Sequence, residues 1–411
     1  MKKSLVALLL VFGLLLMYGC AAPAQAPAAT EAPAAPAETA APELPPAPTA
    51  EPESWAVKNK ITTGTETTDE LYELAKQEGK VTLYSISSRC TKVKESFEAK
   101  YPGVICDAFD ISSDELMEKV TREYESGVRN ADVVHCKDLN GSVYTEKVSQ
   151  GIFYNYYPED IVSSISNKDL IKYSMPLYIE LNQWFYNSKL YDAAPIDSWW
   201  DLTREEWKGN LIMQDPVGDM NYMSVFTSFL AHVDEIEADY EREFGEKLVL
   251  SEGCENAAYE LIYRLFNNDV VFMSSSDEVC ESVAGTGVTE KKLGYGASSK
   301  VRKNADNGWS LAPINILPAT GIPNLNNLYI VNECPHPNAA KLLVRWMVGE
   351  ADGTGEGFNP FNTLGGWSVR DNVPDKEGNT PLSQLNVWPS DVMFIYDNLQ
   401  DMEDFFLKMR G

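Results

Sequence analysis

Polar side chains suited to ligand binding follow a short apolar run in the first part of the sequence. The run 81–84 ends in Ser85, and Ser87, Ser88 and Arg89 come just before a helical pattern begins. Hydroxyl groups and a guanidinium at the end of a strand, beside the free N–H groups of a helix start, can bind a polar or charged ligand. The alternative for each serine is a simple helix cap.

Two further strand-like runs end in the same kind of group. Ser112 and Ser113 follow the run 104–109, and His135 ends the run 132–135. Ligands bind at the carboxyl ends of the strands in parallel sheets, so the three loops are expected to converge at one edge of one sheet. A hydrogen-bonded structural role is the alternative for His135.

The second half of the chain repeats this arrangement. Strand-like runs at 173–178 and 181–187 lead to a strand at 210–213, a helix at 220–231, and a strand at 270–272 that precedes a serine-rich helix start. Candidate ligand-binding residues in this part are Tyr178, Glu180, Asp219, Tyr222, Ser274, Ser275, Ser276 and Tyr295. The second half therefore offers a second set of polar loops.

The order of the elements predicts the fold class. From Thr68 onward short strands alternate with helices, a rhythm that indicates βαβ units and a parallel sheet. The folded part of the 411-residue chain is larger than one hydrophobic core usually accommodates. We therefore expect an α/β protein of two lobes, with a packing helix over 390–409.

The first residues predict export. A basic start precedes the apolar run 5–17, which is too short to span a bilayer as a helix, so residues 1–19 are typical of a signal peptide. Cys20 resembles the lipid acceptor of bacterial lipoproteins, with plain secretory cleavage as the alternative. Residues 20–67 begin with a long stretch of Ala, Pro, Glu and Thr that cannot build a core, and they are predicted to form a tether.

The charge of the chain limits its partners. The formal net charge is −27, and removal of residues 1–19, which carry two lysines and no acid, makes it −29. Such an acidic protein is not expected to bind nucleic acid or anionic lipid, and its charge mildly favours cationic ligands.

Six cysteines remain after Cys20, with no spacing typical of a zinc site. An even number outside the cell permits disulfides, and Cys90 with Cys136 and Cys254 with Cys280 are the expected pairs. For each pair, unpaired buried thiols are the alternative.

A series of short motifs in fixed order resembles a known family. Those of the first half are Glu78-Gly79-Lys80-Val81, Tyr84-Ser85, Phe97, Tyr101-Pro102-Gly103-Val104 and Ala131-Asp132-Val133-Val134. Those that follow are Tyr186-Asn187-Ser188-Lys189-Leu190, Ser198-Trp199-Trp200-Asp201-Leu202, Trp207-Lys208-Gly209-Asn210, Asp215-Pro216, His336-Pro337-Asn338-Ala339-Ala340-Lys341 and Ser368-Val369-Arg370. Together they resemble the extracellular solute-binding proteins of ABC importers, and most closely the iron(III)-type subgroup, over about 71–373.

The resemblance implies an architecture. It is a two-lobe, type 2 periplasmic-binding-protein-like fold, in which each lobe is a mixed, mostly parallel sheet flanked by helices and the lobes are joined by a strand hinge. Lobe 1 would take residues 68–177 and 318–345, and lobe 2 would take 188–312. C-terminal packing helices would follow at 346–411.

The resemblance also implies a function and partners. The protein would be a monomeric solute-binding lipoprotein, held by lipid on Cys20 at the outer face of the cytoplasmic membrane. It would close on one small solute and deliver it to an ABC permease with its ATPase. No cofactor, metal or nucleic acid is expected.

The solute is expected to carry a positive centre. Ferric relatives bind iron through adjacent tyrosines, whereas Tyr295 has no tyrosine neighbour. Asp219 and Glu180 are acidic, whereas some relatives carry residues at these two positions that favour a bound anion. This difference predicts a cationic organic solute, or a zwitterion if Arg89 binds an acidic group of the same molecule. Ferric iron, an organic anion and a sugar phosphate remain alternatives, as do a helix cap for Asp219 and a surface lysine partner for Glu180.

The sequence contains no recognisable catalytic motif. It lacks the nucleophile elbow, metalloprotease, P-loop and dinucleotide fingerprints, and its three histidines offer little general-base chemistry. The protein is therefore not expected to be an enzyme. A secreted hydrolase and a surface sensor are the alternative classes.

Overall fold

The computed structural model describes residues 54–410. The predicted signal peptide at 1–19, the predicted lipid acceptor Cys20 and most of the predicted tether lie outside the described residues. Among residues 54–410, no helix is long and apolar enough to cross a membrane.

The folded part begins earlier than the expected start at Thr68. Helix α1 (Trp55–Lys58) and the turn after it bury Ala56 and Ile61 in the core of the first lobe. These apolar side chains distinguish residues 54–67 from the Ala/Pro-rich stretch that precedes them.

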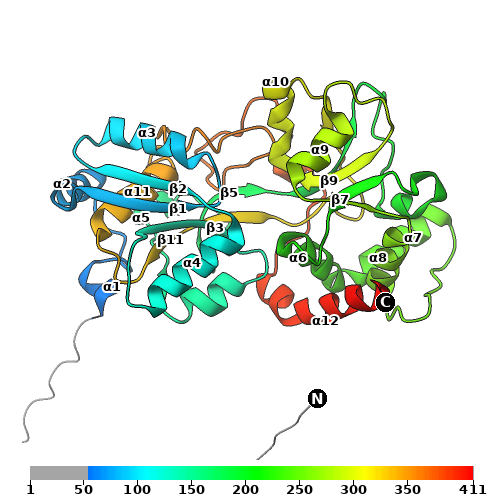
Figure 1. Ribbon diagram of the computed structural model, residues 1–411, viewed down its shortest axis with the longest axis horizontal. Coiled ribbons are helices and arrows are strands. Elements are labelled where there is room, and N and C mark those ends of the chain that lie inside the picture. The colour runs from blue at the N-terminus through cyan, green and yellow to red at the C-terminus, as the bar shows by residue number, and fades with distance from the viewer. Residues whose placement is uncertain (1–53, 411) are drawn as a thin grey trace, which may run out of the picture. The chain divides into compact units, whose positions relative to one another are not determined.

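The first sheet has six strands, in the order β2, β1, β3, β11, β4 with β5 also paired to β11. Their bounds are β1 (Lys80–Ser85), β2 (Ile105–Asp110), β3 (Val133–Lys137), β4 (Phe153–Tyr154), β5 (Met175–Glu180) and β11 (Asn324–Val331). Its helices are α2 (Thr68–Glu78), α3 (Cys90–Lys100), α4 (Ser113–Glu125), α5 (Glu159–Val162) and α11 (Pro337–Met347), with a π-helical turn at Tyr144–Val148. Helices α3 and α4 lie on opposite sides of the sheet (Figure 1). We call this sheet with its helices lobe 1.

The second sheet has five strands, in the order β10, β6, β9, β7, β8. Their bounds are β6 (Asn182–Asn187), β7 (Leu211–Gln214), β8 (Val271–Met273), β9 (Leu293–Ala297) and β10 (Leu311–Pro313). Its helices are α6 (Met220–Ser228), α7 (Val233–Phe244), α8 (Ala257–Phe266), α9 (Ser276–Ala284) and α10 (Lys303–Asn307). This sheet with its helices is lobe 2, and its main core contains Trp184, Trp199, Phe226 and Tyr295.

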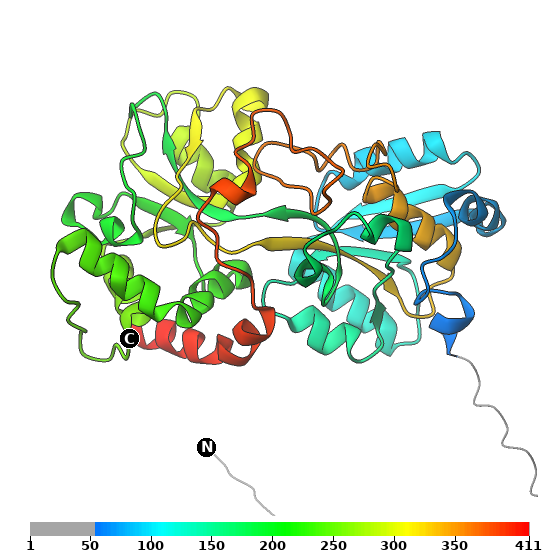
Figure 2. The ribbon, with the colours of Figure 1, turned by 180° about the vertical axis from the view of Figure 1, so that it is seen from behind.

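Three segments join the lobes. β5 continues through Leu181 into β6, and β10 leads back to β11. The third segment is the stretch between α11 and α12 (Val392–Arg410), which pairs with the hinge at Ile179 through Trp367 and is seen in orange and red in Figure 2. The only helical turn in that stretch is Leu382–Gln384, so the region expected to hold packing helices contributes one long helix, α12.

The prediction of a two-lobe α/β fold with a strand hinge is confirmed, although its strand directions differ in one respect. Of the nine strand pairs among residues 54–410, four are parallel and five antiparallel, so the sheets are mixed rather than mostly parallel. The reason is that the strands linking the lobes, β5, β6, β10 and β11, pair antiparallel with their neighbours.

The six cysteines of the described part are all free and buried, so the expected disulfides are wrong. Cys90 opens α3 and Cys136 lies inside β3, and both thiols pack as apolar groups in the core of lobe 1. Burial raises the pKa of the Cys106 and Cys280 thiols to about 12. These cysteines therefore act as small apolar side chains.

Helix α11 buries charge as well as apolar surface. The Lys341 ammonium pairs with Glu66 and donates to the Asn59 carbonyl at 2.8 Å. The Arg345 guanidinium donates to Asp160 Oδ1 at 2.9 Å. Both basic side chains are almost fully buried, so the ion pairs are what allows α11 to lie in the core.

Removing the cap of α2 is expected to lower the free energy of unfolding by about 1 kcal/mol. The Thr67 hydroxyl accepts from the Glu70 N–H at 3.3 Å, and Glu70 accepts in return from the Thr67 N–H at 2.9 Å. Thr67→Ala breaks this reciprocal pair, whereas Thr63→Ala removes only one exposed hydroxyl bond and serves as the control. Urea denaturation checks this, and equal losses in the two variants would contradict the capping role.

Candidate functional site

The three polar loops of lobe 1 end at one edge of its sheet, as expected. In the parallel pairing, Ser85 is opposite Asp110 on one side and His135 on the other. The loops that follow therefore start level with one another, and they do so on the side that faces lobe 2 (Figure 1).

A cavity of about 1020 Å³ lies between the lobes. Lobe 1 contributes the start of α4 and the end of β3, with Ser112, Ser113, Lys137 and Asn140. Lobe 2 contributes the loops that follow β7 and β8, with Gln214, Asp219, Asn221 and Ser274. Helix α12 completes the wall with Tyr396 and Leu399. The strand ends of both sheets thus meet around one space large enough for a small organic molecule.

Asp219 both caps α6 and lines the cavity. Its Oδ1 accepts from the Asn221 N–H at 2.9 Å, and its Oδ2 accepts from Gln214 Nε2 at 3.0 Å. Asp219 is therefore a helix cap, the alternative that the sequence analysis left open. The opposite helix start differs, because Ser112 at the head of α4 makes no side-chain cap bond.

The cavity wall carries charges of both signs. Its acidic side chains are Asp114, Glu118, Glu125, Glu146 and Asp219, and its basic side chains are Arg122, Lys137 and Lys147. Glu118 and Arg122 pair with each other. The wall as a whole therefore does not select ligands by net charge alone.

Glu180 lies at the hinge in a buried group of charges rather than beside a surface lysine. Its carboxylate accepts from Lys137 Nζ at 3.0 Å and lies 3.5 Å from Arg89 Nη2. Burial favours the neutral acid, but the positive charges of Lys137 and Arg89 outweigh it and hold the pKa of Glu180 well below its ordinary value. Glu180 is therefore ionised at neutral pH.

Arg89 contacts the other lobe. Its Nη2 lies 3.4 Å from Ser299 Oγ, and its guanidinium lies over the rings of Tyr178 and Phe361 at 5.4 and 5.5 Å. Arg302 Nη1 also donates to Ser299 Oγ, at 2.9 Å. Burial and the nearby Arg89 charge lower the pKa of Arg302. Arg89 and Arg302 thus form a basic group contributed by both lobes, and Glu180 links Arg89 to the cavity residue Lys137.

His135 is fully buried against this group. Its Nδ1 lies 2.9 Å from Ser85 Oγ, and its ring meets Phe361 edge to face. Burial, with the Arg89 charge acting in the same direction, lowers the pKa of His135 to about 3. His135 is therefore neutral at physiological pH.

Several predicted site residues do not reach the cavity. Tyr222 and Tyr295 pack in the aromatic core of lobe 2, where the Tyr222 hydroxyl donates to the Tyr295 carbonyl at 3.1 Å. Burial raises the pKa of the Tyr295 phenol, which opposes a ferric phenolate at this position. Ser275 caps α9, Ser276 Oγ accepts from the Ala297 N–H, and Ser87 and Ser88 belong to the β1–α3 turn.

Several residues of the cavity wall were not among the predicted site residues: Lys137, Asn140, Gln214, Asn221, Tyr396 and Leu399. Lys137 belongs to a predicted loop, and Tyr396 and Leu399 lie in the predicted packing helix. Behind Lys137, Asn324 and Asn326 on β11 are brought beside Lys137 and Glu180 only by the pairing of β11 with β3 and β5. No local pattern marks such long-range neighbours.

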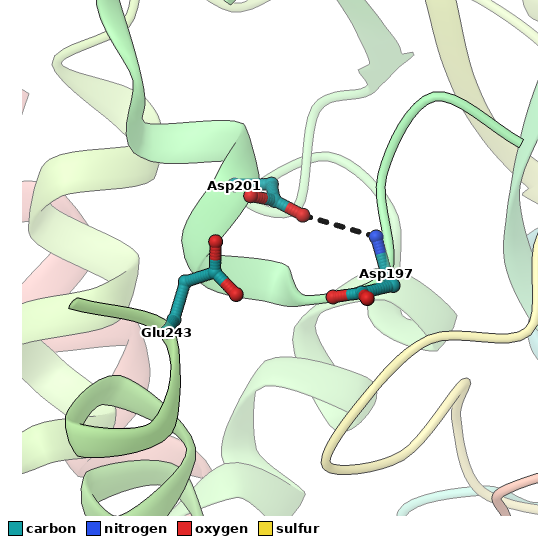
Figure 3. Close-up of side chains that lie close together, drawn as sticks. All are labelled: Asp197, Asp201 and Glu243. Atoms are coloured by element: carbon teal, nitrogen blue, oxygen red, sulfur yellow. Dashed lines mark hydrogen bonds between the residues drawn. The ribbon is translucent and has the colours of Figure 1, made fainter. Parts of the chain in front are cut away.

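A cluster of carboxylates elsewhere in lobe 2 has metal-like spacing. One carboxylate oxygen from each of Asp197, Asp201 and Glu243 lies within 4.8 Å of the other two (Figure 3). Asp201 accepts from the Asp197 N–H and from Arg204 Nε, both at 3.0 Å, and Arg204 also pairs with Glu243. Since these carboxylates are already neutralised, the cluster is a structural ion-pair network.

Solved structures share this fold. The ferric iron-binding protein A of Mannheimia haemolytica, in an open conformation, aligns with a TM-score of 0.59 at 14% identity, over 81% of this chain and 98% of that one. AfuA of Actinobacillus pleuropneumoniae, with fructose-6-phosphate bound, aligns with a TM-score of 0.59 at 15% identity over 80% and 98%. The Trichodesmium protein IdiA (FutA), in complex with iron and citrate, aligns with a TM-score of 0.56 at 15% identity over 80% and 99%.

No family model and no curated protein matches the chain. The structural likeness, together with the cavity between two hinged lobes, defines the architecture of a two-lobe periplasmic binding protein. The neighbours include iron(III)-binding members, in agreement with the resemblance noted in the sequence.

Proposed function

We propose that the protein is the extracytoplasmic solute-binding component of an ABC importer. It binds one small solute in the cavity between the lobes and presents the closed form to a permease with its ATPase. The observation that carries this proposal is that strand ends from both lobes line one cavity at a strand hinge. Closure around a ligand held by both lobes is how such a fold stabilises one conformation.

The predicted N-terminus completes the proposal. A signal peptide at 1–19 followed by lipid on Cys20 would hold the protein at the outer face of the membrane as a monomeric lipoprotein. The binding-protein fold supports this extracytoplasmic location and a binding rather than an enzymatic role.

The expected charge of the solute needs revision. A cationic solute was expected because of Glu180 and Asp219, but Glu180 is bonded to Lys137 and near Arg89, and Asp219 caps α6. A zwitterion remains compatible with these contacts, because its acidic group can meet the basic side chains.

Filling the cavity is expected to abolish solute retention. Ser113 is exposed to the cavity at the start of α4, so Ser113→Trp places an indole in the space that the solute would occupy. Ser126→Trp, at the exposed far end of the same helix, is the matched control. Native mass spectrometry of protein purified without denaturation should find a small molecule on wild type and Ser126→Trp and none on Ser113→Trp. Equal retention by all three would mean that the cavity is not the site.

A further inference from the structure

Helix α12 contacts both lobes. Its side chains Ile395, Met402 and Phe406 are buried in the main core of lobe 2. Near its end, Arg410 Nη1 donates to Asp215 Oδ2 of lobe 2 at 2.9 Å. The first turn of the helix lies at the junction of the lobes (Figure 1 and Figure 2). Helix α12 is therefore a part of lobe 2 whose first turn reaches lobe 1.

The contact of this first turn with lobe 1 is close. A Cβ atom placed on Gly141, in the loop that follows β3, would lie 2.8 Å from the Val392 carbonyl oxygen and 3.5 Å from Met393 Sδ. The Thr145 hydroxyl lies 4.0 Å from the same sulfur. Two atoms 2.8 Å apart, one of them a carbon without a proton to donate, would overlap. Glycine is therefore what permits the helix to approach lobe 1 here.

The loop that meets α12 is held in one shape by its own hydrogen bonds. The Asp138 carboxylate accepts from the Val143 N–H at 3.0 Å and from the Tyr144 N–H at 2.8 Å. The Thr145 N–H donates to the Gly141 carbonyl at 2.9 Å. Gly141 has a φ of +73°, a conformation that glycine adopts without strain. The loop is thus a defined surface against which α12 rests.

Leu139 extends the contact into lobe 2. It follows β3 of lobe 1, yet its side chain is 4% exposed and belongs to the same buried cluster as Trp184 and Ile395 of lobe 2. Separating the lobes would return this side chain to water, which costs free energy. The contact therefore favours the arrangement in which the lobes are together.

The contact lies where opening of the lobes must break it. In both views α12 lies to one side of β5 and β6, the strands that join the lobes (Figure 1 and Figure 2). A rotation about a hinge moves the parts that lie away from the hinge. Tyr396 and Leu399, three and six residues after Met393, line the cavity. Opening therefore separates the first turn of α12 from lobe 1 and moves one wall of the cavity with it.

We propose that residues 138–145 of lobe 1 and the first turn of α12 form a latch between the lobes. The latch favours the closed arrangement even without solute, and it closes the side of the cavity on which Tyr396 and Leu399 lie. A bound solute leaves when the latch opens, so the latch sets how long the solute is retained. The role in retention rests on the proposed function, whereas the effect on closure does not.

A matched pair of glycine variants tests the latch. Gly141→Ala and Gly127→Ala each add a methyl group to a glycine of lobe 1, at φ values of +73° and +74°. Both variants should lose similar stability from backbone strain. The added Cβ at Gly127 has nothing within 4 Å, whereas that at Gly141 meets the Val392 carbonyl. Small-angle X-ray scattering of the full-length protein after exhaustive dialysis should show a larger radius of gyration for Gly141→Ala than for wild type and Gly127→Ala.

A second pair opens the latch from the other side. Met393→Glu places a charge against Gly141 and Thr145, and Met393 is not one of the residues that line the cavity. Leu407→Glu, at a side chain 57% exposed near the far end of the same helix, is its control. The radius of gyration should increase in Met393→Glu and stay unchanged in Leu407→Glu. An unchanged radius in both latch variants, with native circular dichroism, would overturn the latch.

Native mass spectrometry separates the latch from the proposed function. A small molecule retained by wild type should leave Gly141→Ala about tenfold faster, because affinity differences between variants arise mostly in the dissociation rate. If wild type retains no molecule but the latch variants still expand, the latch stands and the solute-binding proposal falls. If wild type retains a molecule and the latch variants neither expand nor release it faster, the latch falls and the solute-binding proposal stands.

Discussion

The protein is expected to lose stability as the pH falls from 6.5 to about 3, by on the order of 1 kcal/mol per pH unit from His135. In the folded state burial and the Arg89 charge lower the pKa of His135 to about 3, whereas the unfolded chain has the ordinary value of 6.5. Between these values the unfolded chain binds a proton that the folded protein does not. The stabilisation is therefore complete above pH 6.5 and is lost progressively toward pH 3.

Urea denaturation across this pH range measures the effect. His135→Gln keeps a hydrogen-bonding group but removes the titration, so the free energy of unfolding of this variant should fall less steeply with decreasing pH than that of wild type. Carboxylates titrate in the same range, but they contribute equally to both curves. Parallel curves would contradict the assignment.

His336 provides a control of opposite sign. Its Nδ1 lies 3.0 Å from Asp132 Oδ2, and this bond raises the pKa of His336. Its stabilisation is fully present below pH 6.5 and is lost as the pH rises through the raised value. The difference between wild type and His336→Gln should therefore be largest at low pH and shrink at high pH.

Replacing Glu180 by glutamine is expected to cost about 3–5 kcal/mol of stability, the usual result of leaving a buried charge without its partner. The Glu180 side chain is 5% exposed and contacts both Lys137 and Arg89. Glu180→Gln keeps the shape of the side chain but leaves two buried cations uncompensated. Thermal and urea denaturation at pH 7 measure the loss.

Glu118→Gln is the control, since Glu118 lines the cavity but its pair with Arg122 is exposed. Its effect on stability should stay below about 1 kcal/mol.

Local patterns predicted the elements of the fold well. The strand-like run 81–84 lies in β1, the strand expected at 210–213 overlaps β7, and the packing helix expected over 390–409 is α12. Each of these signals lies within a few residues of the element that it specifies. The convergence of three strand ends followed from strand direction alone.

The interior of the site could not be predicted in the same way. Asn324 meets Glu180 only because β11 runs antiparallel to β5 from a distant part of the chain. The burial of Lys341 and Arg345 could not be predicted from local sequence either, because their partners Glu66 and Asp160 precede them by more than 180 residues. Which acid neutralises which base is decided by the tertiary structure.

The cavity can form only after helix α12 has been synthesised. Its side chains Ile395, Met402 and Phe406 fill the core of lobe 2, and its first residues touch lobe 1, where the Val392 carbonyl approaches Gly141. A nascent chain that has not yet released these residues from the ribosome lacks both a core segment and a wall of the cavity. The cavity wall is therefore complete only once residues 392–410 have been translated and have folded against both lobes.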